Sequence, residues 1–270
     1  EEHIANTPVQ LVIQRALGFA HPRYAHLPLI LNPDRSKMSK RFSATSLTEY
    51  RAAGYLPDAL ANFIALLGWH GSDDRELLSR DELTAAFELE RVQKAGAVFN
   101  KEKLDWMNAQ YLKHLDNEQI REHIRALGLL PAGVEPAALA RMIATVRERM
   151  HTFADFPTLA AVFIELPVYE PALLRCKEMP AAAVAENLAA AADVLAATDA
   201  HSFTAAALSQ RLAPLTDARG RGEVLWPLRV ALSGSKTSPG PFEIMAVIGK
   251  DESVRRISLA REKAKQLLPL

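Results

Sequence analysis

The chain has 270 residues, 49% of them hydrophobic, and its 32 Lys and Arg residues balance 32 Asp and Glu residues. This composition is typical of a globular protein with two or three domains and excludes a disordered tail or a linker. No run approaches the about 20 apolar residues that a membrane span needs, and Glu1-Glu2 is the opposite of a basic signal-peptide start, so we expect no membrane association.

Cys176 is the single cysteine. A single cysteine cannot form an internal disulfide, and it cannot supply the several thiolates that a cysteine-based zinc site needs. His3, His21 and His26 have no spacing that suggests a metal pair. We therefore expect a cytoplasmic protein without a protein-bound metal.

The charges are distributed unevenly although they sum to zero. Residues 1–45 carry a net charge of +3, residues 46–200 a net charge of −8 and residues 201–270 a net charge of +5. Two basic ends around an acidic middle suit an anionic ligand that is contacted at separate places.

The first predicted elements are a helix and a strand. From Pro8 to Leu17, apolar residues recur at helical spacing, and Gly18 suits the helix end. The apolar run from Leu27 to Leu31 predicts a buried strand that ends at Asn32-Pro33.

A basic loop follows this strand. Residues 34–41, with the sequence Asp-Arg-Ser-Lys-Met-Ser-Lys-Arg, hold four cations and two hydroxyl groups. Mobile lysines and a serine hydroxyl at the end of a strand can bind a polyphosphate, whereas the alternative interpretation is a solvated basic turn.

Helices are predicted for most of the remaining chain. One runs from about Leu56 to Gly68, and the next three are expected to begin at the N-caps Ser79, Asn100 and Asp116. Trp106, between Leu104 and Met107, is expected to pack in the core, although its ring and that of Tyr111 could stack on a nucleotide. After a break at residues 129–133, helices are predicted over 139–150, 186–197, 203–213, 223–232, 241–248 and 253–267, with a connection at 167–171.

Four segments resemble those of one enzyme family. Lys37-Met38-Ser39-Lys40-Arg41 resembles the KMSK signature of class I aminoacyl-tRNA synthetases. Residues 2–10 and 99–108 resemble segments of glutamyl-tRNA synthetases, the second being their KLDWLN helix, and residues 228–240 with 249–250 resemble their helical anticodon-binding domain. The first half of the family's nucleotide-binding fold, with its HIGH motif, has no counterpart in this sequence.

The resemblance implies a mainly α-helical fold with three parts. Residues 1–115 would be the end of a class I nucleotide-binding domain, with the KMSK loop and the stem-contact region. Two all-helical anticodon-binding lobes would follow, at 116–180 and 181–270. A β-barrel anticodon domain is not expected, because no window after Leu31 alternates with a period of two.

The resemblance also implies the site residues. Lys37, Ser39 and Lys40 would bind the phosphates of ATP, which carries its own Mg²⁺. The residues that would contact the anticodon are Arg229, Ser238 and Pro239, with Arg211 as a further candidate on the same surface. Pro241 departs from the family pattern, which has a larger flexible apolar residue there.

We therefore expect the tRNA-binding and anticodon-recognising portion of a monomeric glutamate–tRNA ligase, with tRNA(Glu), ATP and L-glutamate as partners of the full-length enzyme. The 270 residues alone should not activate glutamate, because the other half of the ATP site is missing from them. Whether tRNA(Gln) is also charged is left open by the sequence. A stand-alone helical RNA-binding module without ligase activity is the alternative.

Overall fold

Helices make up most of the structure, a computed structural model that describes residues 1–38 and 46–267. The predicted mainly α-helical fold is therefore confirmed. The chain divides into two units, which are considered separately: unit 1 comprises residues 1–115 and 151–154, and unit 2 comprises residues 116–150 and 155–270. No helix of the described residues is long and apolar enough to cross a membrane.

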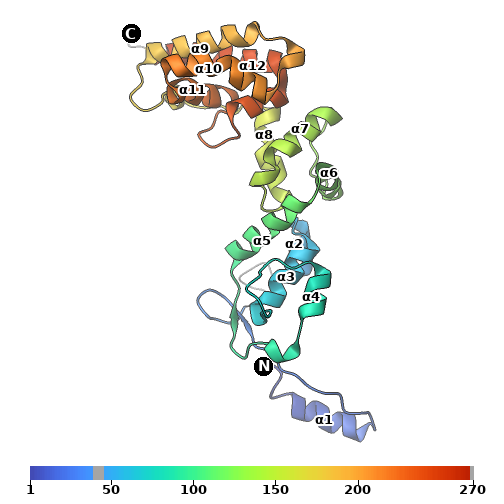
Figure 1. Ribbon diagram of the computed structural model, residues 1–270. Coiled ribbons are helices and arrows are strands. Elements are labelled where there is room, and N and C mark those ends of the chain that lie inside the picture. The colour runs from blue at the N-terminus through green and yellow to red at the C-terminus, as the bar shows by residue number, and fades with distance from the viewer. Residues whose placement is uncertain (39–45, 268–270) are drawn as a thin grey trace. The chain divides into compact units, whose positions relative to one another are not determined.

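In its described residues, unit 1 contains short helices and a two-stranded sheet (Figure 1). Its helices and strands are α1 (Thr7–Ala16), β1 (Ile30–Leu31), α2 (Leu47–Ala52), α3 (Pro57–Gly68), α4 (Arg80–Ala86), β2 (Ala97–Val98) and α5 (Lys101–His114). Strands β1 and β2 pair in parallel, with Ile30 opposite Ala97 and Leu31 opposite Val98.

The predicted helix caps are present. The Ser79 Oγ atom accepts a hydrogen bond from the Glu82 amide at 3.2 Å, and the Glu82 carboxylate accepts one from the Ser79 amide at 2.8 Å. The same reciprocal pair joins Asp116 and Gln119, and the Asn100 side chain accepts a bond from a first-turn amide of α5. These bonds satisfy amide groups that a helix start leaves without an intrahelical partner, so they fix where the helices begin.

The core of unit 1 lies between α3 and α5. Its buried side chains are Tyr55, Leu60, Phe63, Leu104 and Met107. The prediction that Trp106 packs in this core is wrong, because its side chain is 43% exposed. Leu104 and Met107 occupy the buried face of α5, and the intervening turn of the helix directs position 106 toward solvent.

The beginning of unit 1 departs from the expected burial. Helix α1 forms within one residue of its predicted bounds, but its apolar stripe is exposed, with Val12 at 64%. The strand expected over 27–31 is only two residues long, and Leu27 is 57% exposed. The prediction of a buried strand is therefore wrong for this structure: β2 covers one edge of β1, and no described element covers Leu27.

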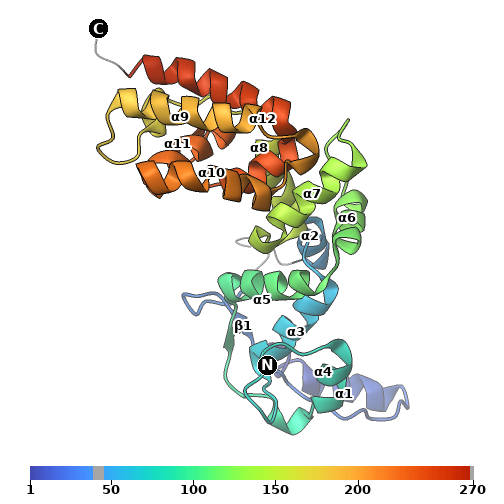
Figure 2. The same cartoon turned by 45° about the horizontal axis from the view of Figure 1, so that its top comes forward.

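Within the described residues, unit 2 contains helices joined by turns and loops, and no strand. Its α-helices are α6 (Asn117–Ala126), α7 (Pro136–Val146), α8 (Phe156–Ile164), α9 (Ala181–Ala196), α10 (Ala205–Arg219), α11 (Arg221–Ser233) and α12 (Pro241–Lys265). Helices α9, α10, α11 and α12 pack side by side, as the two views in Figure 1 and Figure 2 show.

Helix α12 is bent at Gly249, as the two predicted helices on either side of this position imply. Gly249 has a φ of 81°, a left-handed conformation that a helix cannot contain and that glycine adopts without strain. Lys250, the next residue, donates hydrogen bonds to the carbonyl oxygens of Ala196 at 2.7 Å and Thr198 at 2.8 Å. A cation at the end of α9 suits the negative end of its dipole, so the bend also joins α12 to α9.

The predicted connection at residues 167–171 packs onto the helices that follow it. Lys263 of α12 donates a hydrogen bond to the carbonyl oxygen of Tyr169 at 2.9 Å. Trp226 of α11 donates one to the carbonyl oxygen of Leu173, also at 2.9 Å, within a short 3-10 turn over Pro171–Leu174. These bonds tie the connection to α11 and α12, while the division of the helical region near residue 180 stays a prediction.

Candidate functional site

Lys37 and Met38 lie on the returning arm of a tight hairpin that begins at β1. Leu31 and Lys37 form an antiparallel bridge, and the Met38 amide donates to the Ile30 carbonyl oxygen at 3.0 Å. At the tip, the Asp34 carboxylate accepts a hydrogen bond from the Ser36 hydroxyl at 2.6 Å, which lowers the pKa of Asp34. The hairpin thus gives the first two residues of the basic motif a defined place.

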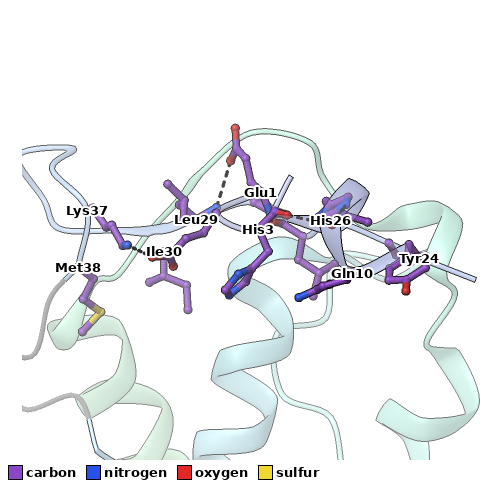
Figure 3. A pocket seen from close by; sticks show the side chains of 14 residues that line it. Glu1, His3, Gln10, Tyr24, His26, Leu29, Ile30, Lys37 and Met38 are labelled. Atoms are coloured by element: carbon purple, nitrogen blue, oxygen red, sulfur yellow. Dashed lines mark hydrogen bonds and ion pairs between the residues drawn. The ribbon is translucent and has the colours of Figure 1, made fainter. Parts of the chain in front are cut away.

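This hairpin borders an open pocket of about 720 Å³. Figure 3 shows Lys37 and Met38 at one end of the pocket, His3 and Gln10 in the middle, and Tyr24 at the other end. The pocket therefore combines the Lys37 ammonium and the carboxylates of Glu1 and Glu2 with polar side chains from α1 and from the segment before β1. In this polar lining, Lys37 is the side chain that can attract an anionic ligand.

The Lys37 ammonium is paired with the carboxylate of Glu2. The hydrogen bond and the charge of Lys37 lower the pKa of the Glu2 carboxyl. Both side chains are about half exposed, so the pair lies in solvent, where such contacts contribute little. An incoming phosphate can therefore compete for Lys37 at small cost. Ser39, Lys40 and Arg41, the rest of the motif, lie outside the described residues.

In unit 2, Arg229 lies on the last two turns of α11. Its side chain is partly exposed, and it makes no hydrogen bond or ion pair with any residue that the structure describes. The helix ends at Gly234, which has a φ of 66°, and residues 234–240 form a turn that leads into α12. We call these residues the α11–α12 turn.

Arg229 and the α11–α12 turn are joined by side-chain hydrogen bonds. The Ser233 hydroxyl donates to the carbonyl oxygen of Arg229 at 2.7 Å, and its oxygen accepts a bond from the Ser235 amide at 3.1 Å. These bonds connect the backbone carbonyl of Arg229 with the start of the α11–α12 turn, and the role of Arg229 at this turn stays a prediction.

Ser238 and Pro239 are buried within the turn. Ser238 is only 6% exposed, and its hydroxyl donates a hydrogen bond to the carbonyl oxygen of Pro239 at 3.0 Å. The exposed residues of the turn are Lys236 and Thr237, which sequence reasoning missed. The glycines at both ends of the turn indicate a tight reversal, whose tip residues face solvent.

Arg211 is exposed on α10, and within the described residues its side chain has no hydrogen-bond or ion-pair partner. Helix α10 packs against α11, so Arg211 and Arg229 belong to neighbouring helices. The described residues contain no group of three or more His, Cys, Asp or Glu side chains that could hold a metal ion.

Two family models match this sequence. Residues 1–106 match the catalytic domain of class I tRNA synthetases (E and Q), and residues 118–261 match an anticodon binding domain. The match at residues 1–106 disfavours the alternative of a stand-alone RNA-binding module.

The relatives are glutamate–tRNA ligases. The ligase of Desulforudis audaxviator is 39% identical over 270 residues, which cover 96% of this chain and 54% of the relative. That of Thermus thermophilus is 37% identical over 269 residues, or 96% of this chain and 56% of the relative. The chain thus spans about half the length of these relatives.

A solved structure is similar as well. The crystal structure of a glutamate tRNA ligase from Elizabethkingia meningosepticum in complex with its amino acid superimposes with a TM-score of 0.80 and 31% identity. The matched region covers 97% of this chain and 56% of that chain.

Proposed function

Because this chain belongs to the glutamate–tRNA ligase family of class I tRNA synthetases, we propose that it is the tRNA-binding and anticodon-recognising portion of a ligase that attaches glutamate to tRNA(Glu). In this proposal the longer protein activates L-glutamate with ATP. These 270 residues would supply one wall of the ATP site and the surface that reads the anticodon.

Arg229 carries the proposal for anticodon reading. Arg229 is half-buried as a residue, and its side chain makes no polar contact within the described part of the chain. A guanidinium can stack on an unpaired base and donate two parallel hydrogen bonds to its edge, whereas an ammonium supplies only charge. Arg229 and the tip of the α11–α12 turn would therefore contact the anticodon bases.

Ser238 and Pro239 enter this proposal through the shape of the turn. Their side chains are buried, so they would present the backbone of residues 236 and 237 to the RNA rather than bind bases themselves. Arg211 on α10 would add positive charge to the same side, where residues 201–270 carry a net charge of +5.

The hairpin at Lys37 supports ATP binding. Lys37 lies at the border of the polar pocket, and its exposed ion pair with Glu2 can be exchanged for one with a phosphate. We propose that Ser39 and Lys40 continue this phosphate-binding loop. ATP would bring its own Mg²⁺, and the 270 residues alone would not catalyse glutamate-dependent ATP–pyrophosphate exchange.

Trp106 gives α5 a surface suited to the stem of the tRNA. Its indole ring is exposed on a helix that also carries Lys101 and Lys103 at its start, where they form solvent-exposed ion pairs with Asp105 and Glu76. An exposed indole can stack on a sugar or base, and lysines can bind phosphate groups. A monomeric state and a cytoplasmic location remain predictions, and charging of tRNA(Gln) is left open by the sequence.

The test is a binding measurement with the 270-residue chain. Fluorescence anisotropy would compare labelled tRNA(Glu) with the same tRNA carrying an altered anticodon, at one fixed salt concentration. We expect the altered tRNA to bind about 5- to 150-fold more weakly, the range that one bidentate base contact gives. Equal affinity for the two RNAs would contradict anticodon reading by this chain.

A further inference from the structure

A fully buried arginine lies in the middle of α12. The side chain of Arg256 is 0% exposed. Burying a charged group is costly unless it is paired and hydrogen-bonded, and arginine is rarely found in a helical core without a specific set of partners. The partners of Arg256 should therefore explain its place.

The guanidinium of Arg256 joins the ends of two other helices. Its Nη1 atom donates hydrogen bonds to the carbonyl oxygens of Val162 at 2.6 Å and Leu232 at 2.7 Å, and its Nε atom donates to Glu252 at 2.7 Å. Val162 lies in the last turn of α8, and Leu232 lies in the last turn of α11. Carbonyl groups in these turns lack intrahelical donors and lie at the negative end of the helix dipole, so a cation satisfies both needs.

The same point of the structure supports the α11–α12 turn. Leu232 precedes Ser233, whose hydroxyl binds the carbonyl oxygen of Arg229. Gly234 follows, and a Cβ atom added to it would lie 2.7 Å from the Pro167 side chain, which belongs to the segment after α8. The end of α11 therefore packs against the segment after α8. This contact, at Gly234, is two residues from the Leu232 carbonyl group that Arg256 binds.

We infer that Arg256 is a positioning residue for anticodon recognition. By bonding the end of α11 to the end of α8, it sets the direction in which Arg229 and the α11–α12 turn face the RNA. Only a guanidinium has donors spaced to reach two carbonyl oxygens and a carboxylate together, whereas a lysine ammonium cannot span all three. This inference rests on the proposed anticodon contact of Arg229 and adds a residue that does not itself touch RNA.

The main test replaces Arg256 with lysine in the 270-residue chain. The readout is the ratio of the affinities for tRNA(Glu) and for its anticodon-altered form, measured together with the melting temperature. We expect Arg256→Lys to melt at a lower temperature and to reduce this ratio at least about fivefold, because a displaced helix end loses base contacts but keeps phosphate contacts. A folded Arg256→Lys variant with the wild-type ratio would overturn the inference.

The matched control is Val184→Ala. Val184 is fully buried in the first turns of α9, and no hydrogen bond of Arg256 involves that helix. This variant should also melt at a lower temperature but keep the wild-type affinity ratio. A similar reduction of the ratio in the control would mean that any loss of stability impairs recognition, and would overturn a specific role of Arg256.

A second variant keeps the test decisive if Arg256→Lys does not fold. Glu252→Gln removes the charge that orients the guanidinium but leaves both carbonyl bonds in place. It should reduce the affinity ratio about two- to fivefold, a fraction of the loss expected for one base contact, and an unchanged ratio would again overturn the inference.

Wild-type protein and the Arg229→Ala variant are measured in parallel, because they distinguish a failure of anticodon reading from a failure of the positioning role of Arg256. If wild-type protein does not discriminate, anticodon reading itself fails and the role of Arg256 fails with it. If wild-type protein discriminates and Arg229→Ala does not, an unchanged ratio in the Arg256 and Glu252 variants overturns the positioning role alone.

Discussion

Replacing Arg229 with alanine should weaken tRNA binding without weakening the fold. The side chain is partly exposed and has no polar partner within the described residues, and alanine suits a helix at least as well as arginine. We therefore expect the free energy of unfolding to change by no more than about 0.5 kcal/mol. Any loss of affinity then reports the contact with RNA.

The size of that loss follows from the chemistry of a guanidinium. A bidentate contact to one base contributes about 1–3 kcal/mol, which corresponds to an affinity about 5- to 150-fold lower for tRNA(Glu). The anticodon-altered tRNA already lacks this contact, so its affinity should fall much less. Titrations of both RNAs at one salt concentration, with urea unfolding of both proteins, would measure these changes.

Arg221→Ala is the matched control for Arg229→Ala. It removes the same charge from the exposed first turn of the same helix, two turns away from Arg229. We expect it to lower the affinity for both tRNAs equally and slightly, as the loss of one long-range charge does. If Arg229→Ala behaves in the same way, Arg229 is a phosphate contact and the reasoning about base recognition is wrong.

Four further predictions concern other parts of the chain. In the longer ligase, Lys40→Ala should lower the rate of glutamate activation more than the affinity for ATP, and a change confined to the KM for ATP would contradict a role in the transition state. Trp106→Ala should weaken binding of tRNA(Glu) and of the anticodon-altered tRNA alike, by about 1–3 kcal/mol for a lost stacking contact, and unchanged titrations would exclude this contact. Gly54→Ala should lower the urea midpoint, because Gly54 has a φ of 82° and a new Cβ atom would lie 2.9 Å from the backbone of Phe153; an unchanged midpoint would contradict this packing. The hydrogen bond from Arg255, together with that from Arg256, lowers the pKa of the Glu252 carboxyl from 4.5 to about 2. The stability that the ionised Glu252 contributes is therefore complete above pH 4.5 and is lost as the pH falls toward 2. That contribution is at most about 3 kcal/mol, and less with solvent screening, so Glu252→Gln should show a shallower loss of stability between pH 5 and 2, and parallel curves would refute the coupling.

The sequence by itself determined most helices and their starts. The boxes at Ser79 and Asp116 and the cap at Asn100 were predictable because capping depends on residues three positions apart in the chain. The bend in α12 was also predictable from local sequence, because glycine, here Gly249, adopts a left-handed backbone without strain whatever packs around it. The box at Ser46 and Glu49 follows the same rule, so the start of α2 is also a local property of the sequence.

Burial was determined only by tertiary structure. The stripe on α1 and the apolar run before β1 have the pattern of buried elements, but a pattern states only that a face is apolar and not whether another element covers it. Trp106 shows the opposite limit: its apolar neighbours in sequence suggest a core residue, yet the orientation of α5 against α3 directs its ring to solvent.

The residues of the candidate sites divide in the same way. The motif at Lys37 and the arginine before the α11–α12 turn can be found from the sequence, because their residue types and order are local. The buried state of Ser238, the pairing of Lys37 with Glu2 and the bonds of Arg256 to Val162 and Leu232 could not be, because each joins or encloses groups that only the packed chain brings together. Arg256 is 94 residues from Val162 in the chain, so no spacing rule connects them. Only the packing of α8, α11 and α12 brings the Arg256 guanidinium within hydrogen-bond distance of the ends of two other helices.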